Sequence, residues 1–239
     1  NIESEKIISS IFKNKSQFLG FNLNHPYFQK INKSIKINLN KIKFFCMGGL
    51  NSITRKNINL IISSFYNIYK DDIKVDIDWE LNVYIQGVEV PEIVNNYKCS
   101  NINYYIDNST YENIVSIYND NDIFLHMGSH EGLGLGFFES LYCGTPIITM
   151  DWNPNNDIIE NNINGWVIDA YKGEMYDNDN SLINKGVINE IDLKNKIIEI
   201  LTNKENTLKI INNTINNKYI LNEKNKNIFN KNLINILSS

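Results

Sequence analysis

The chain has 239 residues, a formal net charge of −4 at pH 7 and a sequence pI of about 5.5. This length holds one good-sized α/β domain, and an acidic chain without a long Lys/Arg block is not typical of a dedicated nucleic-acid-binding protein. No segment approaches the ~18 consecutive apolar residues of a membrane span. Three widely spaced cysteines, Cys46, Cys99 and Cys143, lack metal-site spacing and favour a reduced, cytoplasmic setting.

The chain divides into two parts. Residues 1–38 contain no recognisable motif, and we interpret them as a leading segment that connects to another domain. Residues 39–239 contain alternating strand and helix patterns, followed from Glu190 onward by polar helical sequence. The second part is therefore predicted to be one α/β domain with helices at its carboxyl end.

Short apolar runs alternate with helical periodicity through this second part. Strands are predicted over residues 43–47, 81–86, 101–106, 122–127, 146–150 and 165–169. Helices are predicted over residues 56–70, around 111–118 and over 137–143. Such alternation predicts an α/β fold with a doubly wound, Rossmann-like parallel sheet.

Two loops of this sheet carry the residues of most chemical interest. Gly48–Lys56 and Glu131–Gly136 both follow strands, and ligands of parallel sheets bind at the carboxyl ends of strands. Backbone amides and a helix dipole at such a loop can hold an anion, while Glu131 and Glu139 can accept bonds from hydroxyl groups. The pattern favours a ligand that is both phosphorylated and rich in hydroxyls, namely a nucleotide sugar, so residues 39–239 are predicted to form a nucleotide-sugar-binding domain.

Each feature also has a purely structural interpretation. The glycines can simply make a sharp turn, because GLGLG lacks the G-x-G-x-x-G spacing of dinucleotide sites. Glu139 lies in the first turn of the predicted helix, where the macrodipole favours any acid. Arg55 and Lys56 can be exposed surface cations. His126 and His130 are four positions apart, but they flank a strand end rather than share a helix face, so we expect a core or cleft histidine instead of a metal site.

The segment EGLGLGFFESLYCGTPII, residues 131–148, resembles the signature of the retaining glycosyltransferases of the GT-B fold, in particular family 4, also called group 1. Both acids, the two inner glycines and the Cys-Gly-x-Pro exit match. The chain departs from the family pattern at Gly136, where proline is usual, and at Ser140, where alanine is usual.

The resemblance extends over roughly residues 40–170. The segment from Ile42 to Phe65 is similar to the first strand and helix of the family's donor-binding domain, where basic residues hold the donor diphosphate. Arg55 and Lys56 fit that role, while Gly49 stands where the family often has arginine. Downstream, Asp157 stands where the family usually has Glu.

The resemblance implies specific roles for these residues. Arg55 and Lys56 would stabilise charge on the leaving phosphate, Glu131 would contact the donor sugar, and Glu139 would contact the ribose. We assign Glu131, Lys56 and Arg55 as catalytic residues. The donor-binding residues are Gly48, Gly49, Gly132, Leu133, Gly134, Leu135 and Glu139. The base is expected near Tyr104–Asp107.

The chain is accordingly expected to be the carboxyl-terminal half of a GT-B enzyme of carbohydrate biosynthesis. It would transfer a sugar, as a hexosyltransferase does, from a UDP- or GDP-sugar to an acceptor hydroxyl with retention of configuration. Neither a metal nor a separate cofactor is expected, and the acceptor-binding amino-terminal half is predicted to be missing. The alternative is a non-catalytic module that binds nucleotide sugars or another protein.

Overall fold

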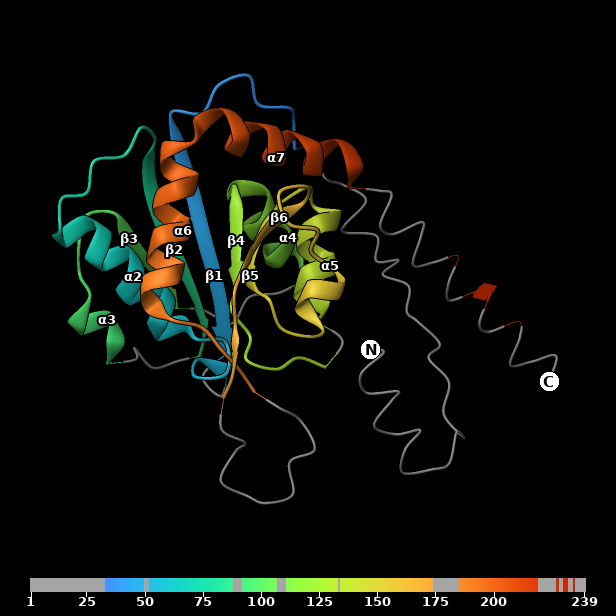
Figure 1. The fold of residues 1–239 in the computed structure, drawn as a ribbon, viewed down its shortest axis with the longest axis horizontal. Helices are drawn as coiled ribbons and strands as arrows, with labels where there is room; N and C mark the ends of the chain where they lie inside the picture. Colours follow the sequence, from blue (N-terminus) through green and yellow to red (C-terminus); the bar gives the residue numbers. More distant parts are fainter. Residues whose placement is uncertain are drawn as a thin grey trace, which may run out of the picture.

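The computed structural model describes residues 33–49, 52–87, 92–106, 111–132, 134–173 and 185–218, together with residues 227, 230, 231 and 234. A six-stranded parallel sheet forms its centre (Figure 1). Its strands are β1 (Lys41–Gly49), β2 (Asp78–Gln86), β3 (Ile102–Ile106), β4 (Ile123–His126), β5 (Ile147–Met150) and β6 (Gly165–Ile168). All six lie where the sequence predicts a strand.

The strand order is β3-β2-β1-β4-β5-β6. The direction in which strands are added reverses between β1 and β4, since the chain builds β2 and β3 on one side and β5 and β6 on the other. In an open α/β sheet a crevice forms at such a reversal, outside the carboxyl ends of the strands. The predicted doubly wound, Rossmann-like α/β fold is therefore confirmed.

Helices cover both faces of the sheet. On one face lie α2 (Ile58–Lys70) and α6 (Glu190–Thr202), and on the other lie α4 (Tyr111–Asp120) and α5 (Leu135–Tyr142). The neighbours Phe44 and Phe45 separate these faces, because successive side chains of a strand point to opposite sides. Phe44 packs with the α2 and α6 side, whereas Phe45 packs with the α4 and α5 side.

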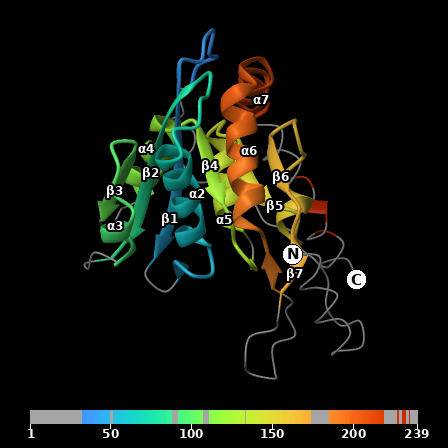
Figure 2. The same cartoon turned by 60° about the vertical axis from the view of Figure 1, so that its left-hand side comes forward.

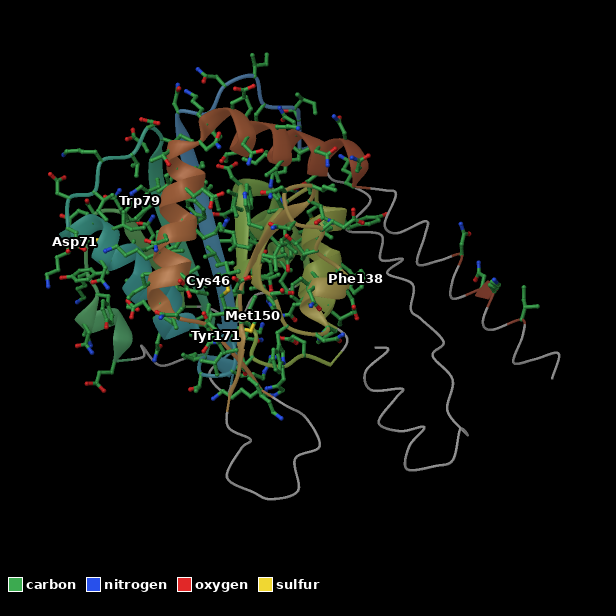
Figure 3. All side chains as sticks on the ribbon, in the orientation of Figure 1. Cys46, Asp71, Trp79, Phe138, Met150 and Tyr171 are labelled. Atoms are coloured by element: carbon green, nitrogen blue, oxygen red, sulfur yellow. The ribbon has the colours of Figure 1, made fainter. Side chains whose placement is uncertain are left out.

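Apolar periodicity explains how α2 docks onto the sheet. Its residues Ile58, Ile61, Ile62, Phe65 and Ile68 are all buried, at the spacing that the sequence predicts. On the same face of the sheet, the sulfur atoms of Cys46 and Met150 lie in the interior, as Figure 3 shows. Buried side chains of this kind hold the strand ends, and hence the loops between them, in fixed positions.

Shorter elements complete the described structure. They are α3 (Ile93–Asn96), the 3-10 helix η3 (Asn155–Asp157), the antiparallel ribbon of β7 (Tyr171–Lys172) and β8 (Gly186–Val187), and α7 (Lys204–Asn217). Figure 1 shows α7 running across the amino-terminal edge of the sheet, and Figure 2 shows β7 near the opposite edge. No helix of the described residues is long and apolar enough to cross a membrane.

One predicted boundary differs in a way that matters for the site. Helix α5 begins at Leu135, two residues before the predicted start at Phe137. Glu139 therefore follows the first turn, which contains no acid. The interpretation of Glu139 as a residue that stabilises the amino end of this helix is wrong, because the dipole effect falls off within the first turn.

The predicted boundary between residues 1–38 and 39–239 stays a prediction, because residues 1–32 lie outside the described part. The described residues before β1 are bonded to the domain. The Lys33 ammonium donates to the Tyr118 carbonyl at 2.9 Å and to the Thr145 hydroxyl at 2.6 Å. Lys36 exchanges backbone hydrogen bonds with the Asn212 side chain on α7.

Candidate functional site

The turn between β1 and α2 lies at the carboxyl edge of the sheet. The Ser52 hydroxyl accepts from the Gly49 amide at 2.8 Å and donates to the Gly49 carbonyl at 3.0 Å. Asn57 has a left-handed backbone, with φ of 52°, and begins α2 without a side-chain cap. This geometry directs Arg55 and Lys56, in the turn just before the helix, towards the crevice beside β4.

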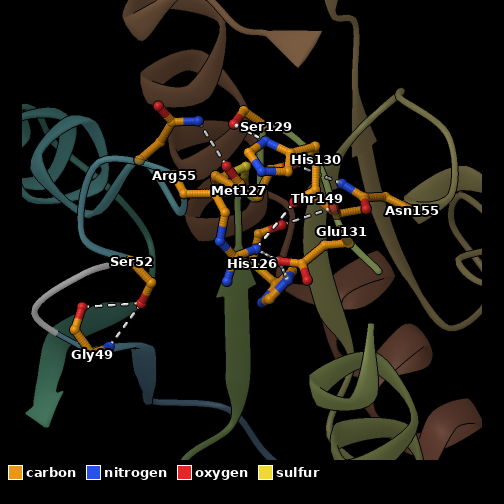
Figure 4. Close-up of polar contacts among 12 residues, drawn as sticks. Gly49, Ser52, Arg55, His126, Met127, Ser129, His130, Glu131, Thr149 and Asn155 are labelled. Carbon is orange, nitrogen blue, oxygen red and sulfur yellow. Dashed lines mark hydrogen bonds and ion pairs between the residues drawn. The ribbon is translucent and has the colours of Figure 1, made fainter. Parts of the chain in front are cut away.

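Hydrogen bonds join this turn to the loop that follows β4. The Asn57 side-chain amide donates to the Met127 carbonyl at 2.7 Å, and the Ser129 amide donates to the Arg55 carbonyl at 2.9 Å. From the other side, the Asn155 side chain donates to the Gly128 carbonyl at 3.2 Å. The two loops predicted to bind the ligand are therefore one bonded unit, as Figure 4 shows.

Arg55 and Glu131 form an ion pair at the centre of this unit. The Arg55 Nη1 atom donates to Glu131 Oε1 at 2.5 Å and to the His130 carbonyl at 3.0 Å. The Nε2 atom of His126 lies 3.0 Å from the same Glu131 oxygen (Figure 4). A methyl group on Gly128 would approach Glu131 Oε1 to 2.6 Å, so the carboxylate lies directly against the backbone there.

The environment of Glu131 keeps it ionised. Burial raises the pKa of this carboxyl, but the hydrogen bonds from His126 and Arg55, together with the positive charge beside it, outweigh burial and lower the pKa to about 2. Burial lowers the pKa of His126, and the positive charges of Lys56 and Arg55 act in the same direction, although the hydrogen bond and the charge of Glu131 oppose the decrease. The imidazole is therefore neutral near pH 7, and its Nε2–H donates to the ionised Glu131.

The loop after β4 turns into α5 at Gly134. This glycine has φ of 64°, a left-handed conformation that glycine adopts without a steric penalty, and α5 has no side-chain cap. Glu139 lies one turn into α5, where its Oε2 accepts a hydrogen bond from the Tyr118 hydroxyl at 3.1 Å. Burial raises the pKa of Glu139, although the Tyr118 bond and the Lys56 charge oppose the increase.

A pocket of about 220 Å³ lies at this edge of the sheet. Its walls include Gly48, Gly49 and Lys56 of the β1–α2 turn, Tyr84 and Gln86 of β2, Tyr105 of β3, Ile114 and Ile117 of α4, and Glu139 of α5. The pocket thus has an apolar wall from α4, a cation from one loop and a carboxylate from α5.

Lys56 places a positive charge in this pocket. Within the described part of the chain its ammonium makes no hydrogen bond or ion pair, although the carboxylates of Glu131 and Glu139 act on it electrostatically. Burial lowers the pKa of Lys56, and the charge of Arg55 lowers it further. A half-buried cation without a bonded partner is costly, and an anionic ligand would relieve that cost.

Two tyrosines form the far wall of the pocket. The rings of Tyr84 and Tyr105 stack, with centroids 4.8 Å apart and an interplanar angle of 14°. The Tyr84 hydroxyl accepts from the Asn121 side chain at 3.3 Å, which fixes the inner ring. Tyr105 is 45% exposed, so a flat aromatic surface faces the solvent at the pocket.

The structure brings some of the predicted residues together and separates others. Gly48, Gly49, Lys56 and Glu139 line the pocket, and Arg55 and Glu131 pair beside it. Gly132, Gly134 and Leu135 form the loop and helix start between them, whereas Leu133 lies outside the described residues.

Residues outside the main site also have defined positions. Tyr105, within the segment expected to contact the base, lines the pocket, but Tyr104 turns away and donates to the Tyr97 carbonyl at 2.7 Å. Asp107 lies outside the described residues, and Asp157 is exposed on η3.

Several pocket residues were not identified from the sequence. Tyr84, Gln86, Ile114 and Ile117 reach the pocket through strand register and helix packing, which single residues do not reveal. Among the described residues, no group of three or more His, Cys, Asp and Glu side chains is arranged to hold a metal ion. His126 is a buried cleft histidine, as the sequence indicates.

Comparison with known protein families shows what this chain is similar to. A sequence profile of the family described as "Glycosyl transferases group 1" matches residues 28–179. A curated relative, the GtfA subunit of UDP-N-acetylglucosamine–peptide N-acetylglucosaminyltransferase of Streptococcus agalactiae, is 34% identical over 99 residues. These residues make up 40% of this chain but only 19% of the relative.

Solved structures show the same fold over most of the chain. They include a mutant of S. aureus TarM in complex with UDP and other ligands (TM-score 0.63, 16% identity) and the pneumococcal O-GlcNAc transferase GtfA in complex with UDP and GlcNAc (TM-score 0.60, 15% identity). Each match covers 97% of this chain and 42% of the other. Anabaena HepE in complex with UDP-glucose has a TM-score of 0.57 at 11% identity, over 84% of this chain and 50% of HepE. The chain therefore spans half or less of these structures and has the Rossmann-like architecture of one half of a GT-B fold.

Proposed function

We propose that this chain, which belongs to the group 1 glycosyl transferases, is the donor-binding half of a retaining glycosyltransferase that uses a nucleotide-diphosphate sugar. The assignment to family 4 within that group and the hexosyltransferase-like reaction are part of the same proposal. Free thiols at Cys46, Cys99 and Cys143 suit a reducing, cytoplasmic setting. Such a location is consistent with a role in carbohydrate biosynthesis.

The position of Lys56 carries the proposal. Its ammonium lies half-buried in the pocket, without a bonded partner in the described part of the chain, where the strand order reverses. A diphosphate placed there would pair with Lys56 and lie near the uncapped amino end of α5, whose amides and dipole favour an anion. Such charge-assisted bonds would stabilise the nucleoside diphosphate as it leaves.

The other site residues complete this binding scheme. Glu139 lies in the same pocket as Lys56 and accepts hydrogen bonds, as a contact with the ribose hydroxyls requires. Glu131 would accept hydrogen bonds from hydroxyl groups of the donor sugar. Arg55 pairs with Glu131 in this structure and does not line the pocket, so its side chain would have to move to reach the diphosphate. Because cations and amides supply the positive charge, the scheme requires no metal ion.

The pocket also supports the proposal that this is half of an enzyme. Its volume of about 220 Å³ is below the ~300–1,000 Å³ typical of ligand sites. A cleft closed by a second domain would supply the remaining wall and the acceptor site. In this scheme the acceptor hydroxyl attacks on the face from which the diphosphate departs, so the configuration of the sugar is retained.

UDP is the favoured nucleotide, because the similar structures of HepE, GtfA and TarM contain UDP or UDP-glucose. A thermal-shift screen of the 239-residue chain with UDP, GDP, ADP and their sugars tests the proposal. We expect stabilisation by a nucleoside diphosphate, strongest with UDP. An unchanged melting temperature with every ligand would contradict the proposal. Binding without any donor hydrolysis or transfer in the presence of the other domain would favour the non-catalytic module.

A further inference from the structure

His126 lies at the carboxyl end of β4 and contacts the Glu131 carboxylate. Its Nε2 atom is 3.0 Å from Glu131 Oε1, and its side chain is only 3% exposed (Figure 4). The ring is therefore not placed to touch a ligand in the pocket. It contacts instead the carboxylate of Glu131, the residue that we propose binds the donor sugar.

Packing fixes the orientation of this imidazole. Its centroid lies 4.5 Å from the Phe137 ring in an edge contact, and 5.4 Å from the Phe124 ring. The Thr149 hydroxyl donates to the His126 carbonyl at 2.8 Å, so the backbone is held as well. The ring has no room to rotate away from Glu131 without displacing buried aromatic side chains.

The surroundings of the ring also determine where its proton lies. The Nδ1 atom is buried and has no hydrogen-bond partner within the part of the chain that the structure describes. A proton there would be an unsatisfied buried donor, which is costly, whereas a proton on Nε2 is bonded to Glu131. Burial and the nearby cations Arg55 and Lys56 oppose a charged ring, and together they outweigh the opposite effect of Glu131, so the pKa of His126 is lowered. The neutral Nε2–H tautomer is the form that fits.

Two donors to Glu131 Oε1, Arg55 and His126, differ in mobility. The Arg55 side chain is 28% exposed and can move into the pocket, whereas His126 is almost fully buried. A bound diphosphate would compete with Glu131 for Arg55. When Arg55 leaves, His126 remains to hold Glu131 Oε1.

We propose that His126 is the positioning residue of this site: its fixed Nε2–H holds the Glu131 carboxylate in the orientation that receives the donor sugar after Arg55 moves to the diphosphate. The inference rests on the proposed function, because it needs Glu131 to contact the sugar. A histidine with a merely structural role would support the core around β4 without affecting sugar recognition.

Two substitutions separate these roles. His126→Gln retains a nitrogen donor that reaches about as far as Nε2, whereas His126→Leu removes the donor and keeps an apolar side chain. Phe45→Leu, a buried change in the same core, controls for lost stability. Each variant of the 239-residue chain is titrated with UDP, UDP-glucose and UDP-N-acetylglucosamine, and its melting temperature is recorded.

The expected result is a selective loss of sugar recognition. His126→Leu lowers the affinity for the better-bound UDP-sugar by about tenfold or more, because a hydrogen bond to a charged group is lost. Its affinity for UDP stays within about twofold of that of the unaltered chain. His126→Gln and Phe45→Leu keep the affinity for UDP-sugar within a few-fold of the unaltered chain. Equal losses for UDP and UDP-sugar, or a His126→Gln variant as weak as His126→Leu, would overturn the inference.

A spectroscopic measurement tests His126 independently of any ligand. Imidazole ¹⁵N spectra of the unaltered chain are expected to show His126 as the neutral tautomer with its proton on Nε2, and this signal should shift in a Glu131→Gln variant. A proton on Nδ1 instead would overturn the inference even if UDP binds. If neither UDP nor its sugars bind while the expected tautomer is seen, the proposed function fails rather than the His126–Glu131 bond.

Discussion

At the scale of single residues, the two acids of the site experience opposite environments. Donors from His126 and Arg55 lower the pKa of Glu131 to about 2, despite its burial. Burial raises the pKa of Glu139, although the hydrogen bond from the Tyr118 hydroxyl and the charge of Lys56 oppose the increase. Glu131 is therefore a fixed anion, while the charge on Glu139 depends on the cation and ligand beside it.

Glu139→Gln tests the assigned contact with the ribose. The amide keeps the size of the side chain but removes its charge, and losing a charged hydrogen bond costs about 1.5–3 kcal/mol. Calorimetry should show a similar loss of affinity for uridine and for UDP, because both contain the ribose. Glu80→Gln, a carboxylate near the amino-terminal edge of the sheet, serves as the control. A loss confined to UDP would show that Glu139 does not contact the ribose.

Acid titration tests the environment of Glu131. Its folded-state pKa of about 2 lies below the ordinary value of 4.5, so ionised Glu131 stabilises the folded state above about pH 4.5. This contribution disappears as the pH falls from 4.5 towards 2. The difference in unfolding free energy between the unaltered chain and Glu131→Gln should therefore shrink over that range. A difference that is independent of pH would rule out the ion pair and hydrogen bond described for Glu131.

The contacts of these residues were the least predictable part of the site. Arg55 and Glu131 are 76 positions apart, and their sequence motifs indicate separate roles rather than a pair. Their contact follows from the adjacency of β1 and β4, which periodicity does not reveal. His126 was predicted to be buried, but the direction of its ring depends on how Phe124 and Phe137 pack.

At the scale of elements, the start of α5 depends on one glycine. Gly134 has φ of 64°, and a methyl group there would lie 2.9 Å from the Phe137 ring. Placing a β-carbon in the left-handed region costs about 1–2 kcal/mol, and the close contact adds to this cost. The glycine loop is therefore required by the backbone at Gly134, whichever ligand the loop binds.

Gly134→Ala should destabilise the chain by about 1–2 kcal/mol or more in chemical denaturation. Gly132→Ala is the matched control, because no atom lies within 4 Å of the position of its added methyl group. Only small destabilisation is expected for that variant. Equal losses of unfolding free energy in the two variants would contradict the special role of the Gly134 conformation.

Long elements were predicted well because their patterns are strong. The six parallel strands and the helices α2, α4, α5 and α6 follow from apolar runs and helical periodicity. The β7–β8 ribbon was missed because its strands have two residues each, too few for any alternation to be visible. The early start of α5 was missed because Gly134 and Gly136 flank Leu135 and obscure the helical pattern there. In the structure the helix begins directly after Gly134 and includes Gly136.

At the scale of the whole molecule, the described chain is proposed to form one wall of a cleft. The pocket opens at the carboxyl edge of a complete sheet, with helices on both faces. Its core therefore needs no other domain to be buried. The chain covers 42% of the length of the TarM and GtfA structures that it resembles, and we propose that the acceptor site lies outside these 239 residues.

The isolated chain is expected to fold but not to transfer sugar to an acceptor. Positioning two reactants can contribute about 7–11 kcal/mol to a reaction, and one wall of a cleft does not provide it. Incubation with radiolabelled UDP-sugars and a panel of acceptors should yield at most slow donor hydrolysis. Acceptor-dependent transfer by the purified chain would place the acceptor site within these 239 residues and end the half-enzyme interpretation.

The central claim is that Lys56 and its pocket bind a nucleoside diphosphate without a metal ion. Calorimetric titration of UDP in the presence of EDTA, into the unaltered chain and into Lys56→Ala, tests it most directly. We expect one binding site that persists with EDTA and is weakened about 10- to 100-fold in Lys56→Ala, while Lys41→Ala, at the opposite edge, binds normally. Binding that vanishes on chelation, or that is equally strong in Lys56→Ala, would contradict the claim.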